Sequence, residues 1–266
     1  GRGRIMTVPV HIGGNVRDFV FDTGAAQFNF VSERFARENG IRMIADSIPV
    51  AGIGRGWVGL GVADSLAVGG IVMRNPVFLI SPPDQATDTI EVISAVLGNA
   101  FMRKAERFTI DNHTRHIVFP AERTLHADGT ERMANMMLNS FQPYVRIHAD
   151  GIPLLFHFDT GNVATTLYPP YYELFREQVD SCGVEDTVRI GGFAGVAENV
   201  CYRLPSVEFT LEGVPFTLRD IDVLPSGSAG ATAGSEAGSL GTDFATAFDT
   251  LTVDYTSCTV RGENVP

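Results

Sequence analysis

An internal duplication restricts the fold of this chain more than any other feature. Residues 8–24, VPVHIGGNVRDFVFDTG, align with residues 145–161, VRIHADGIPLLFHFDTG, at an offset of 137. Both copies read as an apolar run, a glycine-containing turn and a second apolar run, which predicts a β-hairpin. Each hairpin ends in the tetrapeptide Phe-Asp-Thr-Gly. A repeated frame of this kind predicts two similar structural units in one polypeptide.

The two copies match again further along the chain. Residues 95–101, AVLGNAF, align with residues 238–244, GSLGTDF, at an offset of 143, so the second copy has gained six residues in between. A loop insertion is the least costly way to add them. Each copy also holds a helix candidate after the tetrapeptide, one from Ser32 to Asn39 and one from Tyr171 to Val179. Ser32 is the expected N-cap of the first helix, and Gly40 is its expected stop.

The remaining segments read as short strands, with hairpin turns at Gly69-Gly70 and Glu212-Gly213. The fold class is therefore mostly β with few short helices. We expect an N-terminal lobe over residues 1–120, a polar linker over 121–140 and a C-terminal lobe over 141–266. The duplication predicts that the lobes are related by a pseudo-twofold axis.

Composition excludes several classes of function. The chain has 266 residues, 44% of them hydrophobic, which is typical of a folded globular protein. Its net charge of −11 argues against a nucleic-acid partner, because phosphate binding needs clustered Lys and Arg. No stretch reaches the length of a membrane span. The three cysteines, Cys182, Cys201 and Cys258, lack metal-site spacing, so we expect no metal and no cofactor. A Cys182–Cys201 disulfide and three free thiols both remain open.

The paired Asp-Thr-Gly triplets, each followed about 75–80 residues later by a Leu-Gly landmark (Val96-Leu97-Gly98 and Ser239-Leu240-Gly241), resemble the aspartic peptidase family. The short lobes are similar to retroviral-type subunits fused in tandem, as in bacterial retropepsin-like proteins. That resemblance implies two β-barrel-like acid-protease lobes and a peptide or protein substrate. We expect a monomer, because both lobes lie in one chain. The compartment stays open, with an exported (periplasmic or surface) location favoured. It also implies a role for particular residues. The catalytic pair is Asp22 and Asp159; the supporting loop residues are Thr23, Gly24, Thr160, Gly161 and Asn162; and the ψ-shaped loops contain Leu97, Gly98, Leu240 and Gly241.

The chemistry of the motif agrees with this assignment. Two neighbouring carboxylates cannot both ionise easily, so they share one proton. The ionised member deprotonates a water, and the protonated member donates a hydrogen bond to the scissile carbonyl. A single Asp-Thr-Gly is usually an ordinary turn, in which the aspartate caps its own loop. The alternatives are a catalytically silent peptide-binding protein with the same fold and an unrelated β-protein in which the triplets are turns.

Two departures from the pepsin-like pattern matter: the residues that follow the two glycines, and the absence of a tyrosine from the first glycine-rich segment, where Trp57 lies instead. Ala25 and Asn162 stand after the two glycines, where pepsin-like enzymes carry a hydroxyl. We expect the Asn162 amide to donate to Asp159, which makes Asp159 the base and leaves the proton on Asp22. The glycine-rich segments predict one or two flaps over the substrate. The flap candidates are Gly52, Gly54, Trp57, Gly191 and Gly192, although Trp57 also fits a core aromatic and the segments also fit ordinary hairpin turns.

Overall fold

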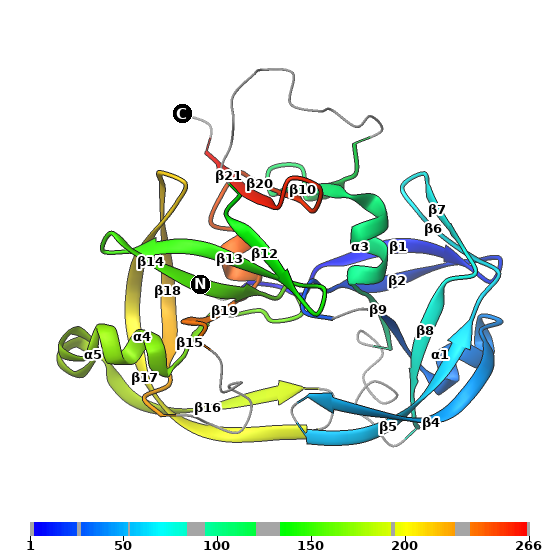
Figure 1. Cartoon of the computed structure of the whole chain (residues 1–266), viewed down its shortest axis with the longest axis horizontal. Helices are drawn as coiled ribbons and strands as arrows, with labels where there is room; N and C mark the ends of the chain where they lie inside the picture. The colour runs from blue at the N-terminus through cyan, green and yellow to red at the C-terminus, as the bar shows by residue number, and fades with distance from the viewer. Residues whose placement is uncertain are drawn as a thin grey trace.

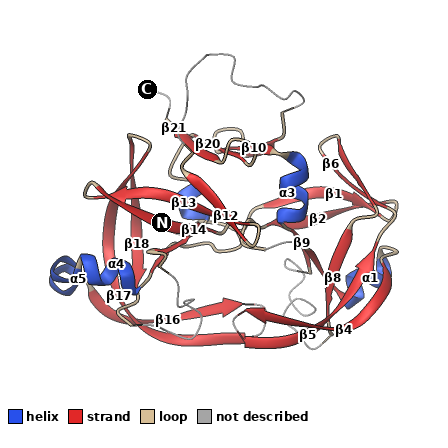
Figure 2. Ribbon diagram, viewed as in Figure 1, coloured by secondary structure: helices blue, strands red, loops and turns tan. Residues whose placement is uncertain are grey.

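The computed structural model describes residues 3–25, 28–52, 54–83, 94–120, 134–192, 195–226 and 235–264. The fold is mostly β, as the sequence predicts. The described strands form three sheets, and the helices are short (Figures 1 and 2).

The first sheet is built from the N-terminal part of the chain. Its strands, in spatial order, are β4 (Arg42–Gly52), β5 (Gly54–Val62), β8 (Val77–Ser81), β3 (Asn29–Ser32), β9 (Ala95–Leu97), β2 (Asn15–Phe21), β1 (Thr7–Ile12), β6 (Ser65–Val68) and β7 (Ile71–Arg74). The predicted hairpin is β1 and β2, and its turn at Gly13 and Gly14 has positive φ angles that favour glycine. The second apolar run of this hairpin lies parallel to β9, which carries the downstream landmark.

The second sheet repeats these connections in the C-terminal part. Its strands, in spatial order, are β12 (Met136–Asn139), β13 (Gln142–Ala149), β14 (Ile152–Phe158), β19 (Gly238–Leu240), β15 (Thr166–Leu167), β18 (Val214–Val223), β17 (Gly195–Leu211) and β16 (Val184–Gly192). Strands β13 and β14 form the second predicted hairpin, and β14 lies parallel to β19. The pairing of β14 with β19 therefore matches the pairing of β2 with β9.

The third sheet joins the two parts of the chain. Its order is β11 (His116–Val118), β10 (Arg107–Asp111), β20 (Thr250–Asp254) and β21 (Thr259–Glu263). The central pair, β10 and β20, comes from opposite copies of the repeat, and Thr109 lies directly opposite Thr252. The last strands of each copy are thus shared in a common sheet.

Five helices occur in the described residues: α1 (Glu33–Glu38), α3 (Asn99–Ala105), α4 (Pro169–Leu174), α5 (Arg176–Cys182) and α6 (Thr242–Ala245). Helix α1 begins after Ser32, whose side chain accepts a hydrogen bond from the Phe35 N–H, so the predicted N-cap is confirmed. The prediction of one helix from Tyr171 to Val179 is wrong. The segment forms two helices, because Phe175 leaves the helical conformation between them with φ −116° and ψ 25°.

A hydrophobic core runs through the body of the molecule. Phe19 and Phe21 of β2, and Phe156 and Phe158 of β14, are fully buried in it. The two phenylalanines at the end of each strand are two residues apart, so both point to the same face of the sheet, which is the core face. Residues 121–133 of the expected linker lie outside the described part, and residues 136–139 form β12. The lobe boundaries and the pseudo-twofold axis stay predictions.

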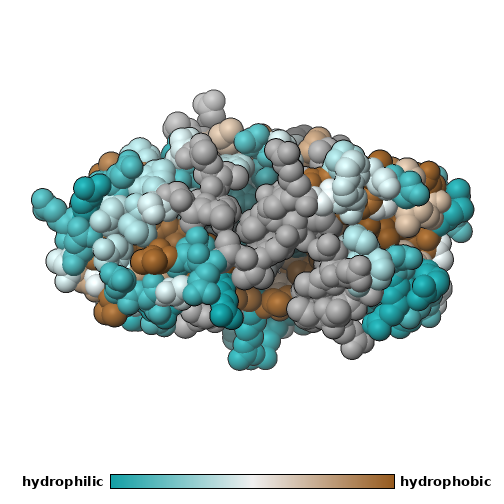
Figure 3. Space-filling view, turned by 90° about the horizontal axis from the view of Figure 1, so that it is seen from below, coloured by the Kyte–Doolittle hydropathy of each residue, from teal (hydrophilic) through white to brown (hydrophobic). Residues whose placement is uncertain are grey.

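Two long hairpins lie on one side of the molecule, and the shared four-stranded sheet lies on the other (Figure 1). One hairpin is β4 with β5, and the other is β16 with β17. They extend toward each other from opposite ends of the chain's long axis, with β9 and β19 between them and the shared sheet. Figure 3 looks onto the hairpin face, where hydrophilic residues dominate much of the described surface.

Candidate active site

Asp22 and Asp159 follow the last residues of β2 and β14. Each backbone N–H is held by the neighbouring parallel strand: Asp22 donates to the Leu97 carbonyl at 3.1 Å, and Asp159 donates to the Leu240 carbonyl at 2.9 Å. The two landmark strands therefore fix the start of the two aspartate loops in the same way.

The carboxyl group of each aspartate lies against the glycine of the opposite loop, an arrangement that we call the crossing of the carboxyls. A methyl group added at Gly24 would lie 2.2 Å from the Asp159 carboxyl carbon, and one added at Gly161 would lie 2.7 Å from the Asp22 carboxyl carbon. Both distances are far shorter than an ordinary contact, so only glycine leaves room for the opposing carboxylate. The two aspartates are consequently neighbours that hydrogen-bond each other and interact through their charges.

Each carboxyl is also held by its own loop. Asp22 Oδ1 accepts from the Gly24 N–H at 2.8 Å and from the Ala25 N–H at 3.0 Å. Asp159 Oδ1 accepts from the Gly161 N–H at 2.9 Å. The second Asp159 oxygen, Oδ2, accepts from the Asn162 side-chain amide at 2.8 Å. The amide therefore points at Asp159, and the side chain of Ala25 offers Asp22 no counterpart.

Burial raises the pKa of both aspartates, but the contact between them affects the two groups differently. Burial raises the pKa of Asp22, and the Asp159 charge and the hydrogen bond between the two carboxyls raise it further. Burial also raises the pKa of Asp159, but hydrogen bonds from Asp22 and from loop N–H groups act against that rise. A proton on Asp22, donated to an ionised Asp159, satisfies both environments.

The threonines tie the two loops together across the junction. The Thr23 N–H donates to Thr160 Oγ1, and the Thr160 N–H donates to Thr23 Oγ1, both at 3.0 Å. The Thr23 hydroxyl donates to the Phe158 carbonyl at 2.7 Å, and the Thr160 hydroxyl donates to the Phe21 carbonyl at 2.6 Å. Both side chains are fully buried, so these four bonds hold the aspartates in register away from water.

The landmark glycines lie directly beneath the loops. An added methyl group would lie 2.3 Å from the Phe28 carbonyl oxygen at Gly98 and 2.7 Å from the Ala164 carbonyl carbon at Gly241. The next residue in each copy holds the loop from below, because the Asn99 N–H donates to the Ala25 carbonyl and the Thr242 N–H donates to the Asn162 carbonyl. The structure therefore places the predicted aspartates, threonines and both pairs of glycines next to one another.

Two supporting residues were not identified from the sequence. The Asn99 side-chain amide donates to the Thr23 carbonyl at 2.6 Å and the Ala25 carbonyl at 2.9 Å. The Gln142 amide donates to the Gly24 carbonyl at 2.6 Å and so reaches the first loop from the second sheet. The place of Asn99 directly after the first landmark glycine was a usable signal, whereas nothing near Gln142 in the sequence indicated this contact.

The flap candidates lie at the far ends of the two long hairpins. Gly52 is paired with Gly54 at the end of the first hairpin, and Gly191 is paired with Val196 near the end of the second. Residues 53, 193 and 194 lie outside the described part. Trp57 is 63% exposed, so it is not a core aromatic. Cover of a substrate by these residues stays a prediction.

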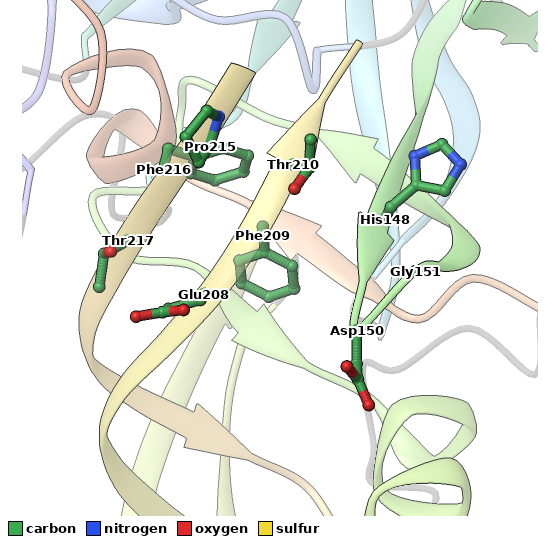
Figure 4. Close-up of a pocket in the computed structure, with 9 residues that line it drawn as sticks. All are labelled: His148, Asp150, Gly151, Glu208, Phe209, Thr210, Pro215, Phe216 and Thr217. Atoms are coloured by element: carbon green, nitrogen blue, oxygen red, sulfur yellow. The ribbon is translucent and has the colours of Figure 1, made fainter. Parts of the chain in front are cut away.

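Other features do not compete with this site. Figure 4 shows a depression over β13, β17 and β18, to which neither aspartate contributes. Cys182, Cys201 and Cys258 are free thiols. In the part of the chain that the structure describes, no cluster of His, Cys, Asp and Glu is arranged to hold a metal ion. Within the same ranges, none of the helices combines the length and apolar character that crossing a membrane requires.

Comparison with known families supports the same assignment. Residues 8–101, which carry the first aspartate loop and its landmark glycine, match a family model described as aspartyl protease. No curated protein matches the chain. The family match supports placing the chain in the aspartic peptidase superfamily.

Proposed function

We propose that this protein is an endopeptidase of the aspartic peptidase superfamily whose catalytic pair is Asp22 and Asp159. The observation that carries the proposal is the crossing of the carboxyls, each of which lies against the glycine of the opposite loop. Only two loops brought together in this way give a shared-proton pair. One chain supplies both aspartates, so one copy is sufficient for catalysis.

The proposed reaction uses one water and no group outside the pair. Ionised Asp159 takes a proton from the water, whose oxygen attacks the scissile carbonyl carbon. Asp22 donates its proton to the carbonyl oxygen and stabilises the tetrahedral intermediate. Asp159 then passes the proton that it took from the water to the amide nitrogen, which leaves as the new amino terminus. As the intermediate collapses to the new carboxyl group, one of its hydroxyl groups returns a proton to Asp22, and the pair regains its starting state. The buried hydrogen bonds of Thr23 and Thr160 hold the pair in place throughout.

The two long hairpins would close over an extended substrate. They lie on the side of the molecule opposite the shared sheet, and both are long antiparallel ladders. Their glycine pairs, such as Gly52 with Gly54, permit bending near the ends. A photo-crosslinker at position 57 should label a bound substrate analogue. No labelling of the analogue above background would contradict the prediction that Trp57 covers the substrate.

The decisive experiment replaces each aspartate by asparagine. Asp22→Asn and Asp159→Asn should each abolish cleavage of a peptide library, and the double variant should cost little more, because the pair acts as one unit. A statine-type peptide, which mimics the tetrahedral intermediate, should inhibit the unmodified protein. If the folded protein binds such a peptide but cleaves no member of the library, it is instead a silent peptide-binding protein.

A further inference from the structure

A row of polar side chains crosses one face of the C-terminal sheet beside the aspartates. Cross-strand pairing joins Tyr144 to His157, His157 to Ser239, Ser239 to Thr166 and Thr166 to Asp222. Residues paired across a ladder point to the same face of a sheet. The five side chains therefore lie in sequence along β13, β14, β19, β15 and β18. We call them the C-terminal row.

The N-terminal sheet has the same row with opposite chemistry. There the pairing joins Thr7 to Val20, Val20 to Val96, Val96 to Phe30 and Phe30 to Leu79. The strands β1, β2, β9, β3 and β8 correspond one for one to those of the C-terminal row. The two halves share a framework, but all except Thr7 of the N-terminal row are apolar. A difference confined to side chains on a matching framework points to recognition rather than to folding.

The C-terminal row faces away from the hydrophobic core. Phe156 and Phe158, on either side of His157 in β14, are fully buried in that core, so His157 points to the other face. Tyr144 and His157 are partly exposed, and their rings lie 5.2 Å apart. His157 is within electrostatic reach of Asp22. This face of the sheet therefore adjoins the catalytic pair and is partly exposed at Tyr144 and His157, whereas Ser239 and Asp222 are buried.

Buried Glu236 supplies a negative charge to this face. It is only 7% exposed, and its charge acts on Tyr144, His157 and Tyr168. At the far end of the row, Asp222 is paired with Arg203 at 2.8 Å, and the same arginine also pairs with Asp186. Because one arginine is shared by two carboxylates, this Asp222 end of the row also has a net negative charge.

The row also offers hydrogen-bond acceptors. His157 Nε2 is buried and has no hydrogen-bond partner among the described residues. Burial lowers the pKa of His157, against the charges of Asp22 and Glu236, which favours the neutral ring. A neutral ring with its proton on Nδ1 accepts a hydrogen bond at Nε2. Lys and Arg side chains are donors only, so they complement a row of acceptors next to a carboxylate.

Building on the proposed function, we propose that the C-terminal row and Glu236 form a subsite for a Lys or Arg side chain on one side of the scissile bond. The N-terminal row, with Val20 and Val96 beside the pair, takes an apolar side chain on the other side. The protein would then cleave between a basic and an apolar residue, and the order of the two is read directly from the products.

The test compares peptides that differ at one position. Lysine is exchanged for norleucine, which keeps the apolar stem and removes the charge, on each side of a leucine-containing scissile bond. The unmodified protein should prefer lysine at one of the two positions by about tenfold or more in kcat/KM. Glu236→Gln should remove about tenfold from the lysine peptide and leave cleavage of the norleucine peptide within about twofold.

Two further variants separate recognition from folding. Glu208→Gln removes an exposed carboxylate of the same sheet and should leave the preference unchanged. The double change His157→Val and Ser239→Val copies Val20 and Val96 into the C-terminal row and should shift the preference toward norleucine. Equal cleavage of both peptides by the unmodified protein, or an equal loss on both peptides in Glu236→Gln, would overturn the subsite.

Binding of statine-type peptides gives a readout that does not need catalysis. The lysine form should bind more tightly than the norleucine form, and Glu236→Gln should remove the difference. If no peptide is cleaved but this preference in binding remains, the endopeptidase proposal fails and the subsite stands. If peptides are cleaved with no preference in cleavage or binding, the subsite fails and the endopeptidase proposal stands.

Discussion

Replacing Thr23 by valine tests whether the crossed threonines hold the two aspartate loops together. Valine keeps the shape of the side chain and removes only the hydroxyl. The hydroxyl donates to the Phe158 carbonyl at 2.7 Å and accepts from the Thr160 N–H at 3.0 Å. Both bonds join the first loop to the second copy of the repeat, and both are buried. The change therefore removes two inter-copy bonds without opening a cavity.

The expected loss of stability follows from the polar groups that lose their hydrogen-bond partners. A buried N–H without a partner costs about 1–3 kcal/mol, and a lost carbonyl bond costs about 1 kcal/mol. The added methyl group recovers about 0.8 kcal/mol through burial. We expect Thr23→Val to lower the free energy of unfolding by about 2 kcal/mol. Thr160→Val should cost the same, because its hydroxyl makes the corresponding bonds at 2.6 and 3.0 Å.

Urea unfolding at fixed pH measures these changes, provided that the slope with denaturant is the same in each variant. Thr252→Val is the matched control. Its hydroxyl shares one partly buried bond of 2.9 Å with Thr109 in the shared sheet, and its loss should cost about 1 kcal/mol or less. If Thr23→Val and Thr252→Val cost the same, the hydroxyls of the crossed threonines do not hold the junction.

Three further predictions concern the pair itself. Burial beside Asp159 raises the pKa of Asp22 to about 8, so the folded protein keeps a proton that the unfolded chain loses, and the free energy of unfolding should fall as pH rises from about 4 to about 8. Asp22→Asn should flatten this fall in thermal melts, and an unchanged slope would contradict the buried proton. Asn162→Ala removes a donor to Asp159, raises the pKa of that carboxyl and should move the acidic limb of the kcat/KM profile up by about one pH unit; an unmoved limb would remove Asp159 as the base. Gly24→Ala puts a methyl group 2.2 Å from the Asp159 carboxyl carbon and should lower kcat/KM by about 100-fold in a protein that circular dichroism shows to be folded; near-normal activity would mean that the carboxyls do not cross during catalysis.

Local signals in the sequence were sufficient for several elements of the fold. Two apolar runs around a glycine-containing turn, in residues 8–21 and 145–158, predicted the two hairpins, because a short turn between strand-forming runs pairs them antiparallel. Ser32 identified the start of α1, because its side chain caps the first turn. The second helical segment was not predicted correctly, because nothing in the sequence around Phe175 signals the break between α4 and α5.

The sequence also predicted the chemistry that we propose for the site before any contact was known. The repeated Asp-Thr-Gly triplets and their landmark glycines imply two loops that need close approach, and the structure brings each glycine against the carboxyl of the other copy. The position of Asn162 after the second triplet was enough to expect its amide on Asp159, since the two residues share one tight loop. Spacing within a few residues constrains geometry strongly, because the chain between them has few conformations.

Contacts between distant segments were decided only by the tertiary structure. The pairing of β10 with β20 joins strands from opposite copies, and no local pattern selects a partner so far along the chain. The same holds for Gln142, whose amide reaches Gly24 from the other sheet, and for the shared charge environment of Glu236 and His157. The repeat indicated what the two halves have in common. The two halves differ in the side chains at matching positions beside the aspartates. Only the strand register of the structure identifies these positions, because register determines the face on which each residue lies.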